Sequence, residues 1–442
     1  MKNRFDVIII GGGPAGSILG SYLAREGIDC AIFEKEQFPR PHVGESLVVS
    51  STLIFQELNL IEKMEAMGFP KKYGAVWTTE KNKKIHAHDW EDVDDAYHME
   101  IQFKDRVLEG AKQNHTYHVD RGRFDEMLLQ HAQHLGCHTF QGTKVAATTM
   151  SENGVQVETK NPEGNTATYS AKLLVDASGR DTFIGKKNKW KVKDPVFNQF
   201  AIHSWFKDYK RSDIENDNIT IHFLPVANSW IWQIPITEEI TSIGIVAQKE
   251  NFLGKKEHAE SYFWETLKTR PELRNKLEAA RQIRPFSIEG DYSYAMKEII
   301  DDRLLLIGDA ARFVDPIFSS GVSIAMQSSK FAAEAIIQAF QKNQFDKSQF
   351  LSYQEKINRG CQNWHDFITL YYRLNVVFTY FLGKKEYRKD VLKFLQGDVY
   401  DESDPEFLKV MRKFVEDVET NPKHPLHDYL GELTAHKFSV NH

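Results

Sequence analysis

A glycine-rich run near the N-terminus, GGGPAG, has the spacing of a phosphate-binding turn. It follows the apolar segment 5–10 and precedes a segment of helical character at 17–27. In such a turn the first glycine permits the tight bend, the second lets a pyrophosphate approach the backbone, and the third lets helix and strand pack closely. The helix N-terminus adds a partial positive charge. We therefore expect a dinucleotide, NAD or FAD, rather than an unoccupied turn, on Gly11, Gly13, Pro14, Ala15 and Gly16.

Polar residues follow three apolar, strand-like segments. Glu34 stands roughly 20 residues past the glycines, where an acid can bond a ribose hydroxyl. Two later segments each end in an acid near a glycine and lead into a helical pattern. Acids in that position can bind the ribityl or ribose chain of an extended cofactor, which favours FAD. The residues of these two segments that we expect to bind the cofactor are Asp176, Gly179, Gly308 and Asp309.

Two tryptophans stand one residue apart in the segment SWIWQIPIT, although the chain has only 8 Trp among 442 residues. In a β-strand, residues i and i+2 point to the same side, so Trp230 and Trp232 would form a double wall. Such a wall can fill an ordinary core, or it can line a cavity and keep something out. The residue types alone leave both possibilities open.

The composition argues against several classes of function. The net charge is −6 and the pI is near 6.3, which lacks the basic balance of a nucleic-acid-binding protein. The 3 cysteines form no C-x-x-C pair, so a reducing, cytoplasmic location is expected. No secretory signal is visible. The most apolar stretch, 367–382, contains Arg373 and Asn375, so we expect no transmembrane segment.

Histidine pairs are weak metal candidates in this chain. His86 and His88 could share one strand face, but no carboxylate or cysteine cluster completes a site. His131 and His134, three residues apart in a helical segment, are expected on the surface. We predict no metal site.

Strand and helix patterns alternate in the N-terminal part, which predicts an α/β fold with a doubly wound, Rossmann-type sheet assembled from distant segments. Alternating apolar and polar residues, as in ITIHFL and WIWQIP, predict antiparallel strands over the cofactor. The remainder is helical and rich in aromatic residues. We expect an FAD-binding domain from 1–75, 107–181 and 293–340, a substrate-side β-sheet domain from 76–106 and 182–292, and a helical C-terminal region at 341–442.

The glycine turn, the two later acid segments and the segment HVDRGRFD together resemble the FAD-binding signatures of the p-hydroxybenzoate-hydroxylase-like flavoproteins. They occur in the expected order over the first three-quarters of the chain. The resemblance implies FAD as the cofactor and puts Arg121 beside it, whereas a surface salt bridge with Asp125 is the alternative. The loop FPRPHVGES resembles the flavin-contacting loop of the same proteins through Arg40, Gly44, Glu45 and Ser46.

The segment W-x-W-x-I-P resembles the diagnostic motif of flavin-dependent halogenases within that superfamily. There the motif lies between flavin and substrate, so Trp230 and Trp232 would exclude the organic substrate and let a small oxidant pass. The loop DPIFSSGV resembles the flavin-proximal loop of the family, in which Ser320 and Gly321 would offer backbone N–H groups to halide. The KYG segment resembles the lysine motif. Lys72 would then direct hypohalous acid, either as a neutral amine or as a charged donor.

The resemblance also implies the co-reactants FADH2, O2, and chloride or bromide. No second strand–glycine–helix unit follows, so a separate flavin reductase is the expected source of FADH2. Phe318 stands where tryptophan halogenases carry a glutamate, so the expected substrate is an electron-rich phenol or pyrrole, free or tethered to a carrier protein. The competing hypothesis is an FAD-dependent reductase, dehydrogenase or monooxygenase of a hydrophobic substrate, similar to geranylgeranyl reductases.

Overall fold

The sheet that carries the glycine turn has six strands. The computed structural model describes residues 2–79, 98–226, 228–249, 252, 258–290, 293–433 and 438. All neighbouring strands of this sheet are parallel except the outermost pair, β20 and β21. The strands, in spatial order, are β20 (Ile300–Asp301), β21 (Leu304–Leu306), β11 (Leu173–Asp176), β1 (Val7–Ile10), β2 (Cys30–Phe33) and β7 (His138–Phe140). The predicted Rossmann-type sheet, assembled from distant segments, is confirmed.

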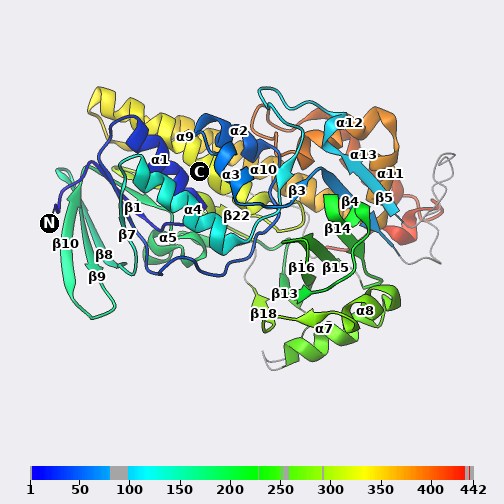
Figure 1. The fold of residues 1–442 in the computed structure, drawn as a ribbon. Helices are drawn as coiled ribbons and strands as arrows, with labels where there is room; N and C mark the ends of the chain where they lie inside the picture. The colour runs from blue at the N-terminus through cyan, green and yellow to red at the C-terminus, as the bar shows by residue number, and fades with distance from the viewer. Residues whose placement is uncertain are drawn as a thin grey trace.

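The two faces of this sheet are covered differently. On one face Ile32 packs against helix α1 (Pro14–Arg25), so closely that a Cβ on Gly20 would lie 2.8 Å from its Cδ1 atom. On the other face the Phe33 ring lies 4.7 Å from the Tyr169 ring. Tyr169 belongs to a three-stranded antiparallel sheet of β8 (Lys144–Ser151), β9 (Gly154–Lys160) and β10 (Thr166–Ala171). Helices therefore cover one face and a small sheet covers the other (Figure 1).

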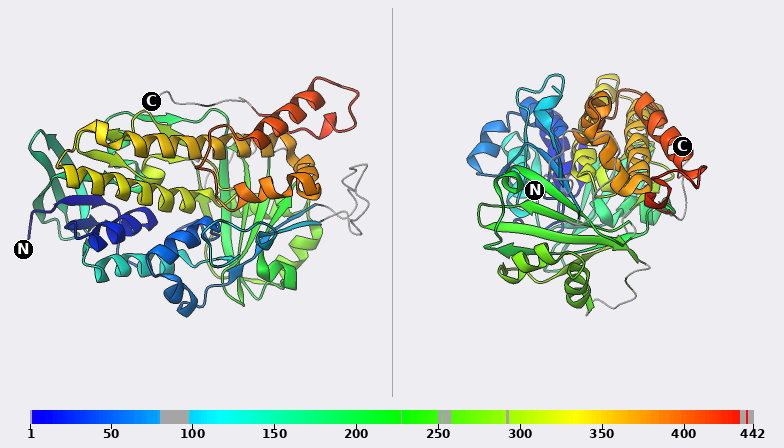
Figure 2. Two further views of the ribbon diagram at one scale, coloured as in Figure 1. Left: turned by 90° about the horizontal axis from the view of Figure 1, so that it is seen from above. Right: turned by 90° about the vertical axis from the view of Figure 1, so that its right-hand side faces the viewer.

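Helix α1 lies between two further helices, α4 (Arg121–His134) and the long α9 (Ser320–Lys342). Figure 2 shows the long α9 (yellow) lying beside the shorter α1 (blue). Shorter helices and paired strands connect these elements to the rest of the chain. They are α2 (Ser50–Glu57), α3 (Ile61–Ala66), α5 (Phe183–Lys187), β3 (Lys71–Lys72) with β6 (Thr116–Tyr117), and β12 (Lys191–Lys193) with β19 (Tyr294–Met296) and β22 (Arg312–Phe313).

A second, larger sheet is antiparallel except where β14 pairs with β4. Its strands are β17 (Arg281–Gln282), β13 (Gln199–Lys207), β16 (Ile240–Gln248), β15 (Trp230–Pro235), β14 (Asn218–Phe223), β4 (Gly74–Thr78) and β5 (His98–Gln102), with β18 (Ser287–Glu289) beside β13. Side chains alternate along β15. Ile231 joins the cluster under α7 (Ala259–Leu267) and α8 (Pro271–Glu278), whereas Trp230 and Trp232 face the opposite way, toward the main core. The sheet thus separates two apolar layers.

The C-terminal helices lie on the side of the large sheet away from α7 and α8 (Figure 1). They are α10 (Leu351–Leu374), α11 (Phe378–Gly383), α12 (Lys385–Leu395) and α13 (Glu406–Glu419), and a short helix α6 (Asp213–Asp217) precedes β14. Phe318 packs among their aromatic rings, 4.8 Å from Phe367 and 5.0 Å from Tyr371. The mixed α/β fold with an antiparallel sheet and a helical C-terminal region agrees with the prediction. Among the described helices, none is long and apolar enough to cross a membrane.

Candidate active site

A cavity of about 700 Å³ extends from the glycine turn to the two tryptophans. Its walls come from the carboxyl ends of β1, β2 and β11, from the loop after β2, from β15 and from the start of α9. This is the position at which open α/β sheets bind their ligands. Of the residues predicted from sequence, the cavity is lined by Gly11, Gly13, Pro14, Ala15, Glu34, Arg40, Gly44, Glu45, Ser46, Arg121, Gly179, Trp230, Trp232, Asp309 and Gly321.

Two positions of the glycine turn leave no room for a side chain. Gly11 has φ +104°, and a Cβ there would lie 2.4 Å from the Ala177 carbonyl oxygen. A Cβ on Gly16 would lie 1.9 Å from the Gly11 carbonyl oxygen. Such distances are not tolerated without movement of the backbone, so both positions require glycine. The turn therefore brings β1, β11 and the start of α1 into direct backbone contact beneath the cavity.

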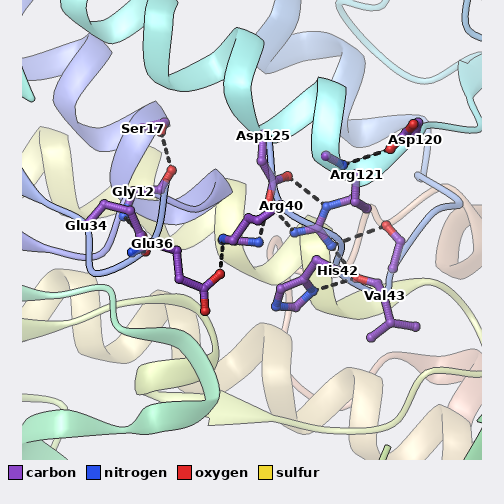
Figure 3. Close-up of polar contacts among 12 residues, drawn as sticks. Gly12, Ser17, Glu34, Glu36, Arg40, His42, Val43, Asp120, Arg121 and Asp125 are labelled. Atoms are coloured by element: carbon purple, nitrogen blue, oxygen red, sulfur yellow. Dashed lines mark hydrogen bonds and ion pairs between the residues drawn. The ribbon is translucent and has the colours of Figure 1, made fainter. Parts of the chain in front are cut away.

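Glu34 closes one end of the cavity and is held by the backbone. Its Oε2 accepts from the Gly12 N–H at 2.7 Å and its Oε1 from the Glu36 N–H at 2.9 Å (Figure 3). The side chain is buried apart from the surface that it presents to the cavity. A carboxylate fixed in this way is placed to accept hydroxyl donors of a ribose.

Two arginines converge on Asp125 at the cavity wall. Arg121 forms a bidentate pair with Asp125, Nε to Oδ1 at 2.8 Å and the terminal nitrogen to Oδ2 at 2.9 Å, and Arg40 approaches Oδ2 at 3.3 Å (Figure 3). Arg121 also donates to the Val43 carbonyl. The ion pair with Asp125 that was considered as an alternative therefore exists, but it is buried and Arg121 also lines the cavity. The Arg40–Asp125 ion pair and the Arg121–Val43 hydrogen bond hold the loop after β2 against α4.

The two indoles form a continuous part of the cavity wall. Their ring centroids are 6.1 Å apart at an interplanar angle of 51°, and both side chains are buried. Trp230 Nε1 donates to the Tyr372 hydroxyl at 2.9 Å, and Trp232 Nε1 donates to Ser242 Oγ at 3.1 Å. A Cβ on Gly244 would lie 2.2 Å from the Trp232 ring. Both rings are thus fixed by hydrogen bonds and by the close approach of Gly244.

Glu45 brings a buried carboxyl to the same end of the cavity. Its Oε1 accepts from Trp205 Nε1 at 2.5 Å, and its Oε2 has no hydrogen-bond partner among the described residues. Burial raises the pKa of this carboxyl to about 7, against the opposing influence of the nearby Ser242 hydroxyl and the Trp205 N–H. The carboxyl of Glu45 can therefore change its protonation state near neutral pH.

The loop before α9 is tied to the tryptophan wall. Ser320 Oγ donates to the Asp315 carbonyl at 2.9 Å, and Asp315 Oδ1 accepts from the Ile317 N–H and from the Tyr372 hydroxyl at 3.1 Å. Burial raises the pKa of Asp315 to about 7. Helix α9 begins at Ser320, and the first N–H groups of a helix have no acceptor within the helix. Of the predicted pair, Gly321 lines the cavity and Ser320 lies behind it.

Lys72 is buried, with 3% of its surface exposed, whereas the adjacent Lys71 is partly exposed and pairs with Glu65. Lys72 Nζ donates to the Leu47 carbonyl at 2.8 Å and lies 5.6 Å from the centre of the Phe103 ring. Burial lowers the pKa of its amine to about 7. Lys72 does not line the cavity; Leu47 directly follows Ser46, which does. The amine therefore lies behind the cavity wall.

Three further predicted residues also lie outside the lining, namely Gly16, Asp176 and Gly308. Asp176 is fully buried and accepts from the Ser178 and Ile184 N–H groups, so it shapes the loop after β11. Sequence reasoning missed other lining residues, among them Val43, Arg180 and Phe313. Their position depends on how distant segments pack together, which the sequence does not indicate.

The histidine predictions have mixed outcomes. His131 is buried and its Nδ1 lies 2.9 Å from Lys63 Nζ, so its predicted surface position was wrong, while His134 is exposed. Helix α3 covers the face of α4 that carries His131, which local spacing could not reveal. Within the described residues no cluster could hold a metal ion. His86 and His88 lie outside the described residues.

Comparison with known proteins agrees with this site. A family model described as FAD binding domain matches residues 4–367. A 1H-pyrrole-2-carbonyl-[peptidyl-carrier protein] chlorinase from Pseudomonas fluorescens is 48% identical over 435 residues, 97% of each chain. A corresponding brominase from Pseudoalteromonas luteoviolacea is 31% identical over 90% of this chain and 93% of its own. The structure of the flavin-dependent brominase Bmp2 superposes with a TM-score of 0.82 at 30% identity, covering 94% and 99% of the two chains.

This chain belongs to the flavin-dependent halogenases. The cavity fits FAD, because its floor is a backbone turn in which a Cβ at Gly11 would collide with the chain, and because Glu34 and Arg121 are fixed beside it. The family uses this cofactor with halide and O2. Membership therefore favours halogenation over the reductase alternative.

Proposed function

We propose that this halogenase installs chlorine or bromine on a pyrrole ring carried as a pyrrole-2-carbonyl thioester by a peptidyl carrier protein. The observation that carries the proposal is the 48% identity, over 97% of both chains, to a protein named as a chlorinase of that substrate. The brominase relative is named for the same carrier-bound pyrrole. Phe318, packed among rings, supports an electron-rich substrate, because it offers no carboxylate to help remove a ring proton.

The first step takes place in the cavity. FAD, when bound and reduced, supplies with O2 the oxidising equivalent that converts halide to hypohalous acid. We propose that Gly11, Gly13 and Glu34 hold its dinucleotide part and that the N–H groups of Ser320 and Gly321 hold the halide. The N-terminus of α9 favours an anion there, and Gly321 faces the cavity. This use of Ser320 is compatible with its Oγ donating to Asp315, since only its N–H is required.

The second step is separated from the first by the indole wall. Trp230 and Trp232 line the cavity, are buried and are fixed by hydrogen bonds. We propose that this rigid wall keeps a pyrrole ring away from the reacting end of the cofactor. A molecule the size of hypohalous acid needs a far smaller opening. Exclusion of the organic substrate from the cavity prevents its direct hydroxylation.

Lys72 is the proposed receiver of the oxidant. As a neutral amine it would form a haloamine and release water, and the pyrrole carbon would then take the halogen and return a hydrogen to the amine. As an ammonium it would hold hypohalous acid by a hydrogen bond and polarise it. With a pKa of about 7, the amine reaches both forms near neutral pH.

The pH dependence separates these two roles of Lys72. A neutral amine predicts a halogenation rate that rises as pH increases through about 7, whereas a charged donor predicts a rate that falls. Glu45 and Asp315 titrate in the same range. The profile should therefore also be measured in Glu45→Gln and Asp315→Asn.

We further propose that FADH2 comes from a separate flavin reductase, because only one strand–glycine–helix unit is evident in the sequence. The three cysteines are free thiols in the structure, which supports the proposal of a cytoplasmic location. Cell fractionation tests that location. Omission of the reductase should abolish turnover, and chemically reduced FAD should restore it.

The decisive experiment offers the enzyme a pyrrole-2-carbonyl carrier protein, free pyrrole-2-carboxylate and a phenol panel, with FAD, a reductase, NADH, O2 and either halide. Mass spectrometry should show halogen on the carrier-bound pyrrole and little on the free acids. Halogenation of a free phenol, with the carrier left unmodified, would show that the substrate is a free phenol and not a carrier-bound pyrrole. Hydroxylated product would support the monooxygenase alternative, and anaerobic oxidation of FADH2 by a hydrophobic alkene would support the reductase.

A further inference from the structure

Four buried polar side chains share one face of a small ladder of strands behind the cofactor cavity. Strand β3 pairs with β6 so that Lys72 stands opposite Thr116, and Ser46 forms a single bridge with His118. Residues paired in an antiparallel ladder point to the same side, as do residues two apart on one strand. Lys72, Thr116, His118 and Ser46 therefore point to one side, and Tyr117 points to the other.

Several buried polar atoms on this face have no hydrogen-bond partner among the residues that the structure describes. All four side chains are at least 96% buried. Within the described part of the chain, Ser46 Oγ, Thr116 Oγ1 and both ring nitrogens of His118 have no hydrogen-bond partner. Buried polar groups without partners are costly, and several together point to a small polar molecule that is held there. By contrast the Tyr117 hydroxyl on the opposite face donates to Glu65 at 2.8 Å.

This cluster lies between the cavity and Lys72. Ser46 lines the cavity, whereas Lys72 does not. His118 and Thr116 lie on the strand between them, since that strand pairs with Ser46 on one side and with Lys72 on the other. Burial, together with the nearby charges of Lys72 and Arg211, holds the pKa of His118 well below its usual range. The imidazole is therefore neutral, with one donor and one acceptor nitrogen.

We propose that His118, with Thr116 and Ser46, is the polar lining that takes the small oxidant from the cavity and orients it and the Lys72 amine for halogen transfer. His118 is then a positioning residue for Lys72. The inference rests on the proposed function, because it assigns the path by which hypohalous acid reaches the lysine. Hypohalous acid carries one hydrogen-bond donor and several lone pairs, which matches a neutral imidazole beside two hydroxyls.

The test compares His118→Phe, Thr116→Val and His118→Gln in the FAD-loaded enzyme with Tyr117→Phe as control, which alters the opposite face of the same strand. Each is assayed with carrier-bound pyrrole in the presence of monochlorodimedone, a scavenger of free hypohalous acid. We expect halogenated carrier per FADH2 to fall at least about 5-fold in His118→Phe and Thr116→Val, with a matching gain in scavenger halogenation. His118→Gln, which keeps a polar atom, should recover much of the loss.

Two measurements separate positioning from folding. Thr116→Val removes an unpartnered buried hydroxyl, so the melting temperature of this variant should stay the same or rise. Its yield of halogenated carrier per FADH2, which we call coupling, should fall. Without turnover, NMR titration of 15N-lysine-labelled protein should show the Lys72 midpoint falling by about 0.5 unit or more in His118→Phe, because a neutral acceptor near the ammonium is lost. Tyr117→Phe should leave both measurements unchanged.

The proposal would be overturned if His118→Phe produced as much halogenated carrier per FADH2 as the wild type and its Lys72 amine titrated at an unchanged pH midpoint. A loss of coupling in Tyr117→Phe equal to that in Thr116→Val would also overturn it. If the wild-type enzyme halogenates neither carrier nor scavenger, the proposed function fails. The Lys72 midpoint then still decides whether His118 acts on the amine.

Discussion

The two ends of the cavity differ in how their buried carboxylates are partnered. At the glycine-turn end both oxygens of Glu34 accept backbone N–H groups, and both oxygens of Asp125 accept from Arg121. At the tryptophan end Glu45 Oε2 and Asp315 Oδ2 have no hydrogen-bond partner among the described residues. Burial raises the pKa of Glu45 and of Asp315 to about 7.

This difference suggests a division of roles: the glycine-turn end holds the cofactor, and the tryptophan end carries out the chemistry. Fully paired carboxylates are held in one geometry, which suits a site that binds a large charged cofactor. Buried groups with displaced pKa values change protonation near neutral pH, and such groups concentrate at reacting centres. Substitutions at the first end should therefore affect FAD retention, and substitutions at the second should affect coupling and pH dependence.

The largest effect is expected from Gly16→Ala at the glycine-turn end. Its Cβ would lie 1.9 Å from the Gly11 carbonyl oxygen, so β1 and α1 must separate. We expect a loss of at least about 2 kcal/mol in the free energy of unfolding and no retained FAD. Flavin absorbance of the purified protein and denaturant unfolding measure both. Gly27→Ala is the control, because nothing lies within 4 Å of its Cβ, although its φ of +73° still adds about 1 kcal/mol of strain. If Gly16→Ala and Gly27→Ala retained equal amounts of FAD, the assignment of cofactor binding to the glycine-turn end would be wrong.

The next effect is expected from Gly244→Ala at the tryptophan end. Its Cβ would lie 2.2 Å from the Trp232 ring, so the indole must move. We expect FAD affinity to stay within about 3-fold while halogenated product per FADH2 falls about 10-fold, because the wall is disturbed and the turn is not. Gly290→Ala, with open space around its Cβ, is the matched control. A parallel loss of FAD would show that the two ends are not separable.

A smaller effect concerns the pH dependence of stability at Glu45. Its pKa is about 7 in the folded protein and 4.5 as the ordinary value, so the folded state binds more protons between these pH values. Glu45 therefore lowers stability progressively from pH 4.5 to 7, and the penalty is complete above pH 7. We expect Glu45→Gln to gain up to about 3 kcal/mol at pH 8 and almost nothing near pH 4. Denaturant unfolding at both pH values measures this, and an equal gain at both would contradict the assignment.

The smallest effect is expected from Tyr372→Phe. The hydroxyl links Trp230 to Asp315, and so connects the wall to the halide loop. Its loss should cost about 1 kcal/mol of stability and raise the KM for halide about 3-fold, with FAD affinity unchanged. Halide titrations at saturating FADH2 measure this. An unchanged KM would mean that the wall and the loop are positioned independently.

Local patterns predicted much of the cofactor end, because its parts follow one another closely in sequence. The turn at Gly11 to Gly16 and the acid Glu34 are defined by strand, glycine and helix order, and the Trp230/Trp232 face follows from the two-residue period of a strand. The structure places most of these residues, Gly16 excepted, on the wall of one cavity.

The other end depends on contacts between distant segments. Glu45 meets Trp205 across 160 residues, and Tyr372 meets Asp315 across 57. The polar face of His118 arises because two strands of two residues each happen to pair, and such short strands give no periodic signal. His131 was wrongly expected on the surface for the same reason, since its cover comes from α3.

The central claim is that a small oxidant crosses to Lys72 while the organic substrate never meets the flavin. It is tested most directly by halogenation of the pyrrole-loaded carrier in Lys72→Met, with Lys71→Met as the neighbouring control, both loaded with FAD. We predict that Lys72→Met consumes FADH2 and halogenates the scavenger but loses at least about 100-fold of its carrier halogenation. Lys71→Met should resemble the wild type. Carrier halogenation by Lys72→Met at the wild-type rate would contradict the account.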